Sequence, residues 1–270
     1  MEKSSSKANR YTKIIETIFF EKYRKGDSHI PFKRDEFISV ADKLNVKLPK
    51  NLGDIIYSFR FRVDLPIQVL ETQPPGYEWL IKLEGKGLYS FSLEKELKIV
   101  PNSSLIQTKI LDATPEIIKL YSLTDEQALL AILRYNRLID IFLGITCYSL
   151  QNHLRTSVKN IGQIETDEIY IGVNSNGVQF AIPVQAKGGT DKQGKVQIEQ
   201  DIALCEDKFP DLICRPVAAQ FMPNGTIALF AFEIDSEKEL RISLEKHYQL
   251  VQKDELSAEE VNRYRIMRNT

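Results

Sequence analysis

The sequence predicts an α/β (α+β) protein with two domains, and three observations lead to this fold class. The chain has 270 residues, 43% of them apolar, which is enough to build two hydrophobic cores. Apolar residues recur at helical spacing through most of the first 62 positions, whereas strand-like runs with a helix between them fill the chain from Gly162 onward. We therefore place one domain at 1–100 and a second at 101–270.

The first domain is predicted from three helices followed by a hairpin. Helical patterns cover 10–23, 33–46 and 51–62, and strand patterns at 77–85 and 88–94 flank a Gly-Lys-Gly tip. This order is that of a winged helix-turn-helix module, in which the third helix usually enters the DNA major groove. Its candidate DNA contacts are Lys50, Asn51, Ser58, Arg60 and Arg62, with Lys86 on the wing. Winged helices also mediate protein contacts, so this alternative stays open.

The second domain is predicted to begin with helices and to continue as a sheet. A strand and a short helix are expected within 98–124, followed by helices at 125–144 and 146–158. Strands at 163–173 and 178–187 flank an Asn-Gly turn, and Pro183 indicates a bulge or an irregular edge. A helix at 195–209 and strands at 212–221 and 226–234 complete an α/β core.

Composition narrows the setting in which the chain works. No apolar run approaches the roughly 20 residues needed to span a bilayer, and the first residues are hydrophilic. The three cysteines and three histidines lack the spacing of a disulfide framework or a zinc site, so we expect a cytoplasmic protein with reduced thiols. Residues 1–100 hold 18 basic and 14 acidic side chains, a net charge of +4, and the remainder carries −5. The basic front half weakly favours nucleic acid as a partner there.

Polar side chains gather where the two strands of the second hairpin meet. Asp167 stands near the start of the first strand, and Gln185 and Lys187 end the second. Antiparallel pairing through the turn at 174–177 would bring these three side chains to one edge of the sheet. Carboxylate and carbonyl oxygens are the ligands that Mg²⁺ prefers, and a lysine beside a metal-bound water favours hydroxide. The set therefore predicts metal-assisted phosphodiester hydrolysis.

At these residues the chain resembles the PD-(D/E)XK nuclease superfamily over roughly 125–235. The resemblance implies that Asp167 is the first acid, that Lys187 is the lysine, and that Asp167, Gln185 and the carbonyl of Ala186 hold Mg²⁺. Gln185 departs from the pattern, because an acid is expected at that position and a neutral amide binds metal more weakly. Glu165 or Glu168 could compensate, and we favour Glu165 because it shares a strand face with Asp167.

Further polar residues are assigned by the same resemblance. Gln197 and Gln200, on the helix after the hairpin, would face the site or DNA. Gln151, Asn152 and Arg155, at a predicted helix end, are more often surface and capping residues than site residues.

The resulting hypothesis is a Mg²⁺-dependent endonuclease of double-stranded DNA, most similar to type II restriction enzymes. It would act as a homodimer, with a cognate DNA methyltransferase as a possible partner. The alternative is a non-catalytic winged-helix DNA-binding regulator with a degenerate nuclease-like domain. A third interpretation, a phosphate-binding P-loop at 189–196, fails at Val196, where Ser or Thr is needed, and too few residues follow it.

Overall fold

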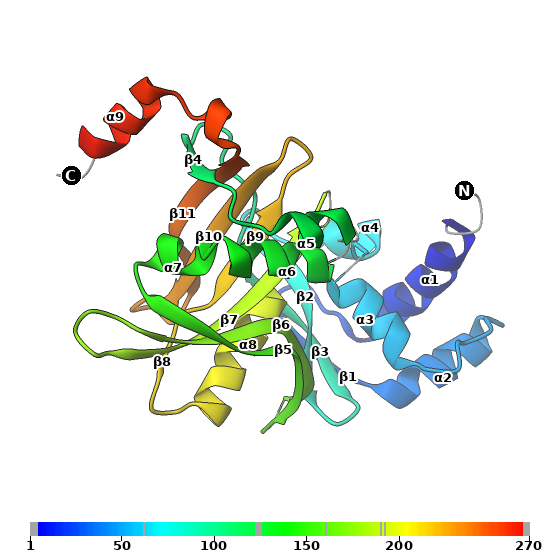
Figure 1. Ribbon diagram of the computed structural model, residues 1–270. Coiled ribbons are helices and arrows are strands. Elements are labelled where there is room, and N and C mark those ends of the chain that lie inside the picture. Colours follow the sequence, from blue (N-terminus) through cyan, green and yellow to red (C-terminus); the bar gives the residue numbers. More distant parts are fainter. Residues whose placement is uncertain are drawn as a thin grey trace. The chain divides into compact units, whose positions relative to one another are not determined.

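The computed structural model describes residues 5–61, 63–121, 126–159, 161–189, 191 and 193–266, without the side chains of 5–10, 61 and 126. The chain divides into two compact units (Figure 1). The first comprises Met1–Lys98 together with Arg155–Ile164 and Gly194–Val196, and the second comprises the rest. The predicted fold class is confirmed, because the chain combines helices with a mixed sheet. No helix in the described ranges has the length and apolar character needed to cross a membrane.

The first unit packs helices on a three-stranded antiparallel sheet. Its elements are α1 (Ser5–Lys22), β1 (His29–Lys33), α2 (Arg34–Lys43), α3 (Gly53–Phe61), α4 (Ile67–Leu70), β2 (Tyr77–Gly85) and β3 (Leu88–Lys95), with strand order β1-β3-β2. The core collects the helical apolar stripes, such as Ile18 and Phe37, against Phe91 in the middle strand. Neither β1 nor α4 was expected from the sequence. The order of elements is compatible with a winged helix, and this finer assignment stays a prediction.

The second unit is built on a mixed sheet with strand order β4-β11-β10-β9-β7-β6-β5. The short strand β8 also pairs with β7 and is not part of this linear order. Its strands are β4 (Gln107–Leu111), β5 (Thr146–Val158), β6 (Gly162–Val173), β7 (Gln179–Gly188), β8 (Ile213–Cys214), β9 (Val217–Phe221), β10 (Thr226–Ile234) and β11 (Leu240–Val251). Its helices are α5 (Glu116–Tyr121), α6 (Glu126–Tyr135), α7 (Leu138–Leu143), α8 (Lys195–Lys208), η1 (Lys253–Glu255) and α9 (Ala258–Ile266). The C-terminal part of β5 and the first residues of β6 and α8 belong to the first unit.

Two expected helices differ in the structure. The stretch 146–158 forms strand β5, which lies at the edge of the sheet, and its polar side chains point outward. The helix predicted at 125–144 is broken into α6 and α7, because Arg137 adopts a left-handed conformation with φ of 52°. The two shorter helices together cover one face of the sheet, where Leu130 and Phe142 pack on Val184.

The β6–β7 hairpin is confirmed, and it positions the candidate site. Asn174 and Val178 close the turn through a backbone hydrogen bond of 3.1 Å, and Gly177 has the positive φ that this turn needs. Pro183 lies in an interior strand, which corrects the expected edge. It is tolerated there because β7 pairs with β8 up to Ala181 and with β9 only from Val184 onward, so the missing N–H falls between the two ladders.

Candidate active site

The candidate site lies where β6 and β7 separate, within the second unit. The two strands pair from Val173 and Gln179 to Glu168 and Val184, and the neighbouring Asp167 carboxylate accepts from a backbone donor of β7. The N–H of Ala186 donates to Asp167 Oδ2 at 2.9 Å, and the Lys187 ammonium lies 3.9 Å from the same oxygen. Asp167 is buried, with 7% of its surface exposed. The structure therefore brings together the acid and the lysine that the sequence analysis singled out.

Gln185 faces helix α8. Its side-chain Nε2 donates to both carboxylate oxygens of Asp201, at 2.9 and 3.2 Å, and lies 3.4 Å from Thr166 Oγ1. Its Oε1 is buried and has no hydrogen-bond partner among the residues that the structure describes. A buried acceptor without a donor is costly, so this oxygen is a candidate ligand for a cation.

Asp201 is the residue of this cluster that sequence reasoning missed. It lies on α8 with 1% of its surface exposed, and burial raises the pKa of Asp201 to about 8. The hydrogen bonds from Gln185 and Thr166 act against this rise, as does the charge of Lys187, whereas the charge of Asp167 adds to it. The cluster therefore holds two acids and one lysine within electrostatic reach of each other. The available signal was an acid on the buried stripe of α8, one turn after Ile198 and one turn before Cys205.

The residues present have the chemistry that Mg²⁺ requires. The donors are the carboxylate of Asp167, the orphaned Oε1 of Gln185 and the backbone carbonyl of Ala186, all of them hard oxygens. Within the described ranges, no group of three or more His, Cys, Asp or Glu side chains is arranged to hold a metal ion. A site here would rest on amide and backbone oxygens as well as carboxylate.

The two glutamates beside Asp167 have different surroundings. Glu165 is partly exposed, and its Oε1 lies 3.4 Å from Nδ1 of His153 on β5. Glu168 is fully buried, 3.1 Å from Nε of Arg134 on α6, and accepts a hydrogen bond from Ser149. Burial raises the pKa of Glu168, and its contacts with Ser149 and Arg134 oppose that rise. Glu168 is therefore engaged with α6 and β5, and the preference for Glu165 as the compensating acid stays a prediction.

The remaining polar residues assigned by resemblance lie on two elements. Gln197 is half-buried and Gln200 is buried on α8, the helix that carries Asp201. We expected Gln151, Asn152 and Arg155 at the end of a helix, but the structure places them in strand β5. Their interpretation as helix caps is wrong, because this stretch is a strand.

The side chains expected on the recognition helix are engaged with the protein itself. Asn51 Oδ1 accepts the N–H of Gly53 at 3.1 Å and its Nδ2 donates to Asp54 at 2.8 Å, so this residue caps the start of α3. Ser58 donates to the carbonyl of Asp54 at 2.8 Å. Lys50 is exposed just before the helix. Arg62 lies outside the described residues.

The prediction for Arg60 is corrected by the structure. Its Nε donates to the carbonyl of Ile81 on β2 at 3.0 Å, and burial lowers the pKa of Arg60 to about 10. The guanidinium is therefore directed at the sheet of the first unit and not into a groove. Lys86, by contrast, is exposed at the hairpin tip, where it was expected.

The stretch 189–196 does not present its lysine as a phosphate-binding loop would. Lys195 has 5% of its surface exposed, lies 2.9 Å from Glu94 and donates to the carbonyl of Lys95 at 3.1 Å. A P-loop lysine must reach phosphate oxygens, and a buried, ion-paired lysine does not. The structure therefore speaks against the nucleotide-binding interpretation.

Comparison of the chain with models of known protein families, with curated protein sequences and with solved structures found no match.

Proposed function

We propose that this protein is a Mg²⁺-dependent endonuclease acting on double-stranded DNA. The observation that carries the proposal is the Lys187 ammonium 3.9 Å from Asp167, on the strand that also carries Gln185 with its orphaned Oε1. An acid, a neutral oxygen donor and a cation where two neighbouring interior strands separate suit phosphodiester hydrolysis. The resemblance of these residues to the PD-(D/E)XK pattern supports the same conclusion.

Each side chain has a definable task in this proposal. Asp167, Gln185 Oε1 and the Ala186 carbonyl would hold Mg²⁺, which lowers the pKa of a bound water and offsets charge on the phosphate. Asp201 binds the amide nitrogen of Gln185, which leaves the amide oxygen as the end that can act as a ligand. Lys187 supplies a positive charge for the attacking hydroxide and for the pentacovalent phosphorus.

The partners follow from the reaction. Cutting both strands of a duplex requires two such sites, so we propose a homodimer. A type II restriction activity would also require a cognate methyltransferase to protect host DNA.

A second candidate is a DNA-binding regulator without catalytic activity. The neutral Gln185, bound through its amide to a buried acid, favours this alternative, because an amide holds a metal less tightly than a carboxylate.

The test compares plasmid cleavage in Mg²⁺ and in EDTA for the wild type, for Lys187→Ala, and for Lys246→Ala as a matched control at an exposed lysine. We expect discrete Mg²⁺-dependent products with the wild type and the control. Loss of cleavage with unchanged DNA binding is expected for Lys187→Ala. Wild-type protein that shifts DNA in a gel but never cuts it would favour the regulator.

A further inference from the structure

The exposed face of α3 is not basic. Arg60 is directed at the sheet, and the side chains that α3 exposes are those of Asp54 and Tyr57. Lys50, four residues before Asp54, is exposed just ahead of the helix. An exposed acid opposes close approach to phosphates, so this helix is poorly suited to lie in a groove.

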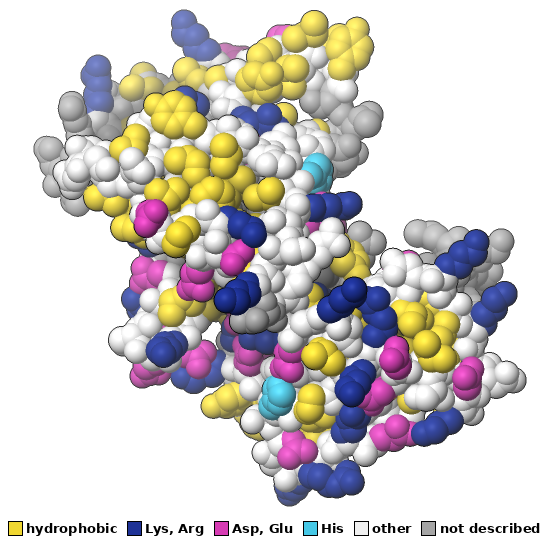
Figure 2. Space-filling model, turned by 90° about the horizontal axis from the view of Figure 1, so that it is seen from below, with side chains coloured by type: hydrophobic (Ala, Val, Ile, Leu, Met, Phe, Trp, Pro, Cys, Tyr) yellow, Lys and Arg dark blue, Asp and Glu magenta, His cyan; other side chains and the backbone are white. Residues whose placement is uncertain are grey.

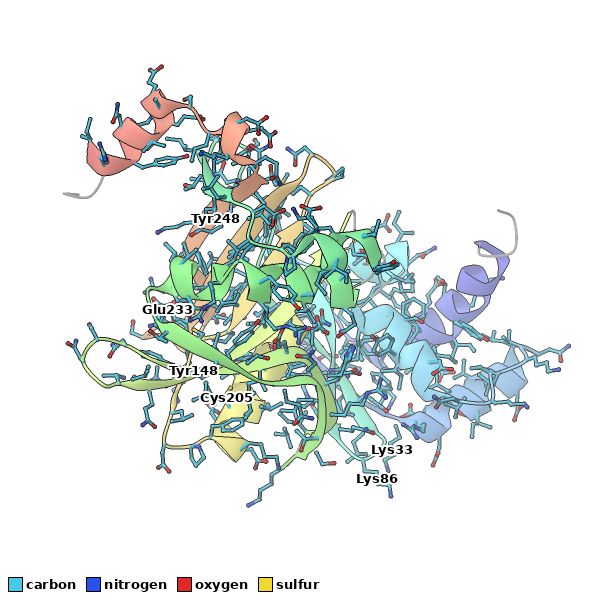
Figure 3. All side chains as sticks on the ribbon, in the orientation of Figure 1. Lys33, Lys86, Tyr148, Cys205, Glu233 and Tyr248 are labelled. Carbon is cyan, nitrogen blue, oxygen red and sulfur yellow. The ribbon has the colours of Figure 1, made fainter. Side chains whose placement is uncertain are left out.

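Exposed basic side chains gather instead at one end of the three-stranded sheet. Lys33 ends β1 and pairs with Leu88, the first residue after the tip of the β2–β3 hairpin. The backbone N–H of Arg34 donates to the carbonyl of Gly87 at 2.9 Å, which attaches the start of α2 to that tip. Lys33, Arg34 and Lys86 are all exposed, and we call them the tip cluster. Figure 3 shows Lys33 and Lys86 beside one another at this end of the sheet.

The backbone holds the tip cluster in place. Gly85 and Gly87, with φ of 140° and 73°, allow the tight turn that projects Lys86 between them. The Arg34 guanidinium donates to the hydroxyl of the buried Tyr89 at 3.2 Å, which orients it while Arg34 remains exposed. Side chains fixed in this way lose less conformational entropy when they bind a partner.

Two acids near the tip have side-chain partners outside the tip cluster. Glu36 lies 3.0 Å from Lys22, and Glu84 lies 2.6 Å from His29. Asp35, next to Arg34, is the exception among the neighbouring acids that the structure describes. This end of the sheet therefore keeps an excess of positive charge. Figure 2 views the molecule from below, so that this end faces the reader, and dark blue side chains gather there alongside magenta ones.

We propose that the tip cluster, and not α3, is the surface with which the first unit binds the phosphate backbone of double-stranded DNA. Arginine and lysine at a rigid β-turn suit phosphate oxygens, and no base-reading helix is needed for this contact. The inference rests on DNA being the partner in the proposed function, and it replaces the predicted groove contacts of α3 with backbone contacts from the sheet.

The experiment measures binding alone. Fluorescence anisotropy of a labelled DNA duplex in EDTA, at several salt concentrations, compares wild type with the triple variant Lys33→Gln/Arg34→Gln/Lys86→Gln. The matched control Lys13→Gln/Lys25→Gln/Lys47→Gln removes the same charge from exposed positions of the same unit. We expect the tip variant to bind roughly 10- to 100-fold more weakly and to lower the slope of log affinity against log salt by about 2–3, since each phosphate contact contributes about 0.9. The control should stay within about threefold of wild type.

Equal losses in the two triple variants, a larger loss in the control, or a wild type that does not bind DNA would each overturn the tip assignment. Cleavage is scored separately in Mg²⁺. If the tip variant loses DNA binding but the wild type does not cut, the endonuclease proposal is contradicted and the tip assignment stands. If the wild type cuts and the tip variant binds DNA as well as the wild type does, the tip assignment is contradicted and the endonuclease proposal stands.

Discussion

The Asp201→Asn substitution should stabilise the protein, and the gain should grow with pH. The folded state raises the pKa of Asp201 from 3.8 to about 8, so it binds this proton more tightly than the unfolded chain does. Well below the unfolded pKa both states carry the proton, so ionisation of Asp201 does not change the free energy of unfolding there. As pH rises the unfolded chain releases the proton first, so wild-type stability falls until the folded pKa is passed.

The magnitude follows from the size of the shift. Each unit of pH between the two pKa values costs about 1.4 kcal/mol, so the wild type loses about 3 kcal/mol between pH 5 and pH 7 relative to a residue that does not titrate. Asparagine is such a residue and has nearly the same shape. Its oxygen can accept from Gln185 Nε2, which keeps one of the two hydrogen bonds that Gln185 donates to Asp201.

Urea denaturation followed by circular dichroism at pH 5, 6 and 7, in EDTA, measures the effect. Tryptophan fluorescence would report on the first unit, because Trp79 is the single tryptophan and lies in that core. Asp211→Asn, at an exposed acid beyond α8, is the matched control and should show no trend. A stability difference for Asp201→Asn that is the same at all three pH values would refute the assignment of a buried, protonated acid.

Three further predictions concern the same unit. Glu168→Ala should lower the free energy of unfolding, measured by urea titration, by about 2–3 kcal/mol, because Arg134 loses its ion-pair partner but is partly exposed. Adding Arg134→Met to this variant should recover part of the loss, because no unpaired charge is then left. Gly172→Ala should cost about 1–3 kcal/mol by the same assay, because a Cβ there would lie 2.6 Å from Ile145 Cγ2. Burial raises the pKa of the Cys147 thiol to about 12, so its alkylation at pH 8 should be slow in the folded protein and fast in urea, as followed by mass spectrometry.

Local patterns sufficed for the elements with strong periodicity. The three N-terminal helices, the β2–β3 hairpin and the β6–β7 hairpin lie close to their predicted positions, because the helices have a clear apolar period and each hairpin closes on a glycine or asparagine turn. Strand β5 was mistaken for a helix. It is an edge strand whose neighbour covers one side only, so most of its side chains are exposed and no alternation of apolar residues marks it.

The candidate site was predictable as far as it is local. Asp167 and Lys187 meet because one hairpin joins them, and the turn that closes it is visible in the sequence. The contact between Gln185 and Asp201 depends on the packing of α8 on the sheet. Strand patterns do not specify which turn of a following helix lies over a given strand residue, so Asp201 was not identified.

Helical spacing, applied strictly, would have predicted that Arg60 faces the core side of α3. Ile56 and Arg60 are four residues apart, so they lie on one face of α3, and Ile56 is buried in the core of the first unit. A basic residue at that spacing is expected to bury its stem and to seek a backbone carbonyl, as Arg60 does with Ile81. The same spacing places Asp54 and Tyr57, three residues apart, on the exposed face. A basic residue on a predicted recognition helix can contact DNA only if it lies on the face opposite the buried apolar stripe. Arg60, the basic residue of α3, lies on the same face as Ile56 and so does not meet this condition.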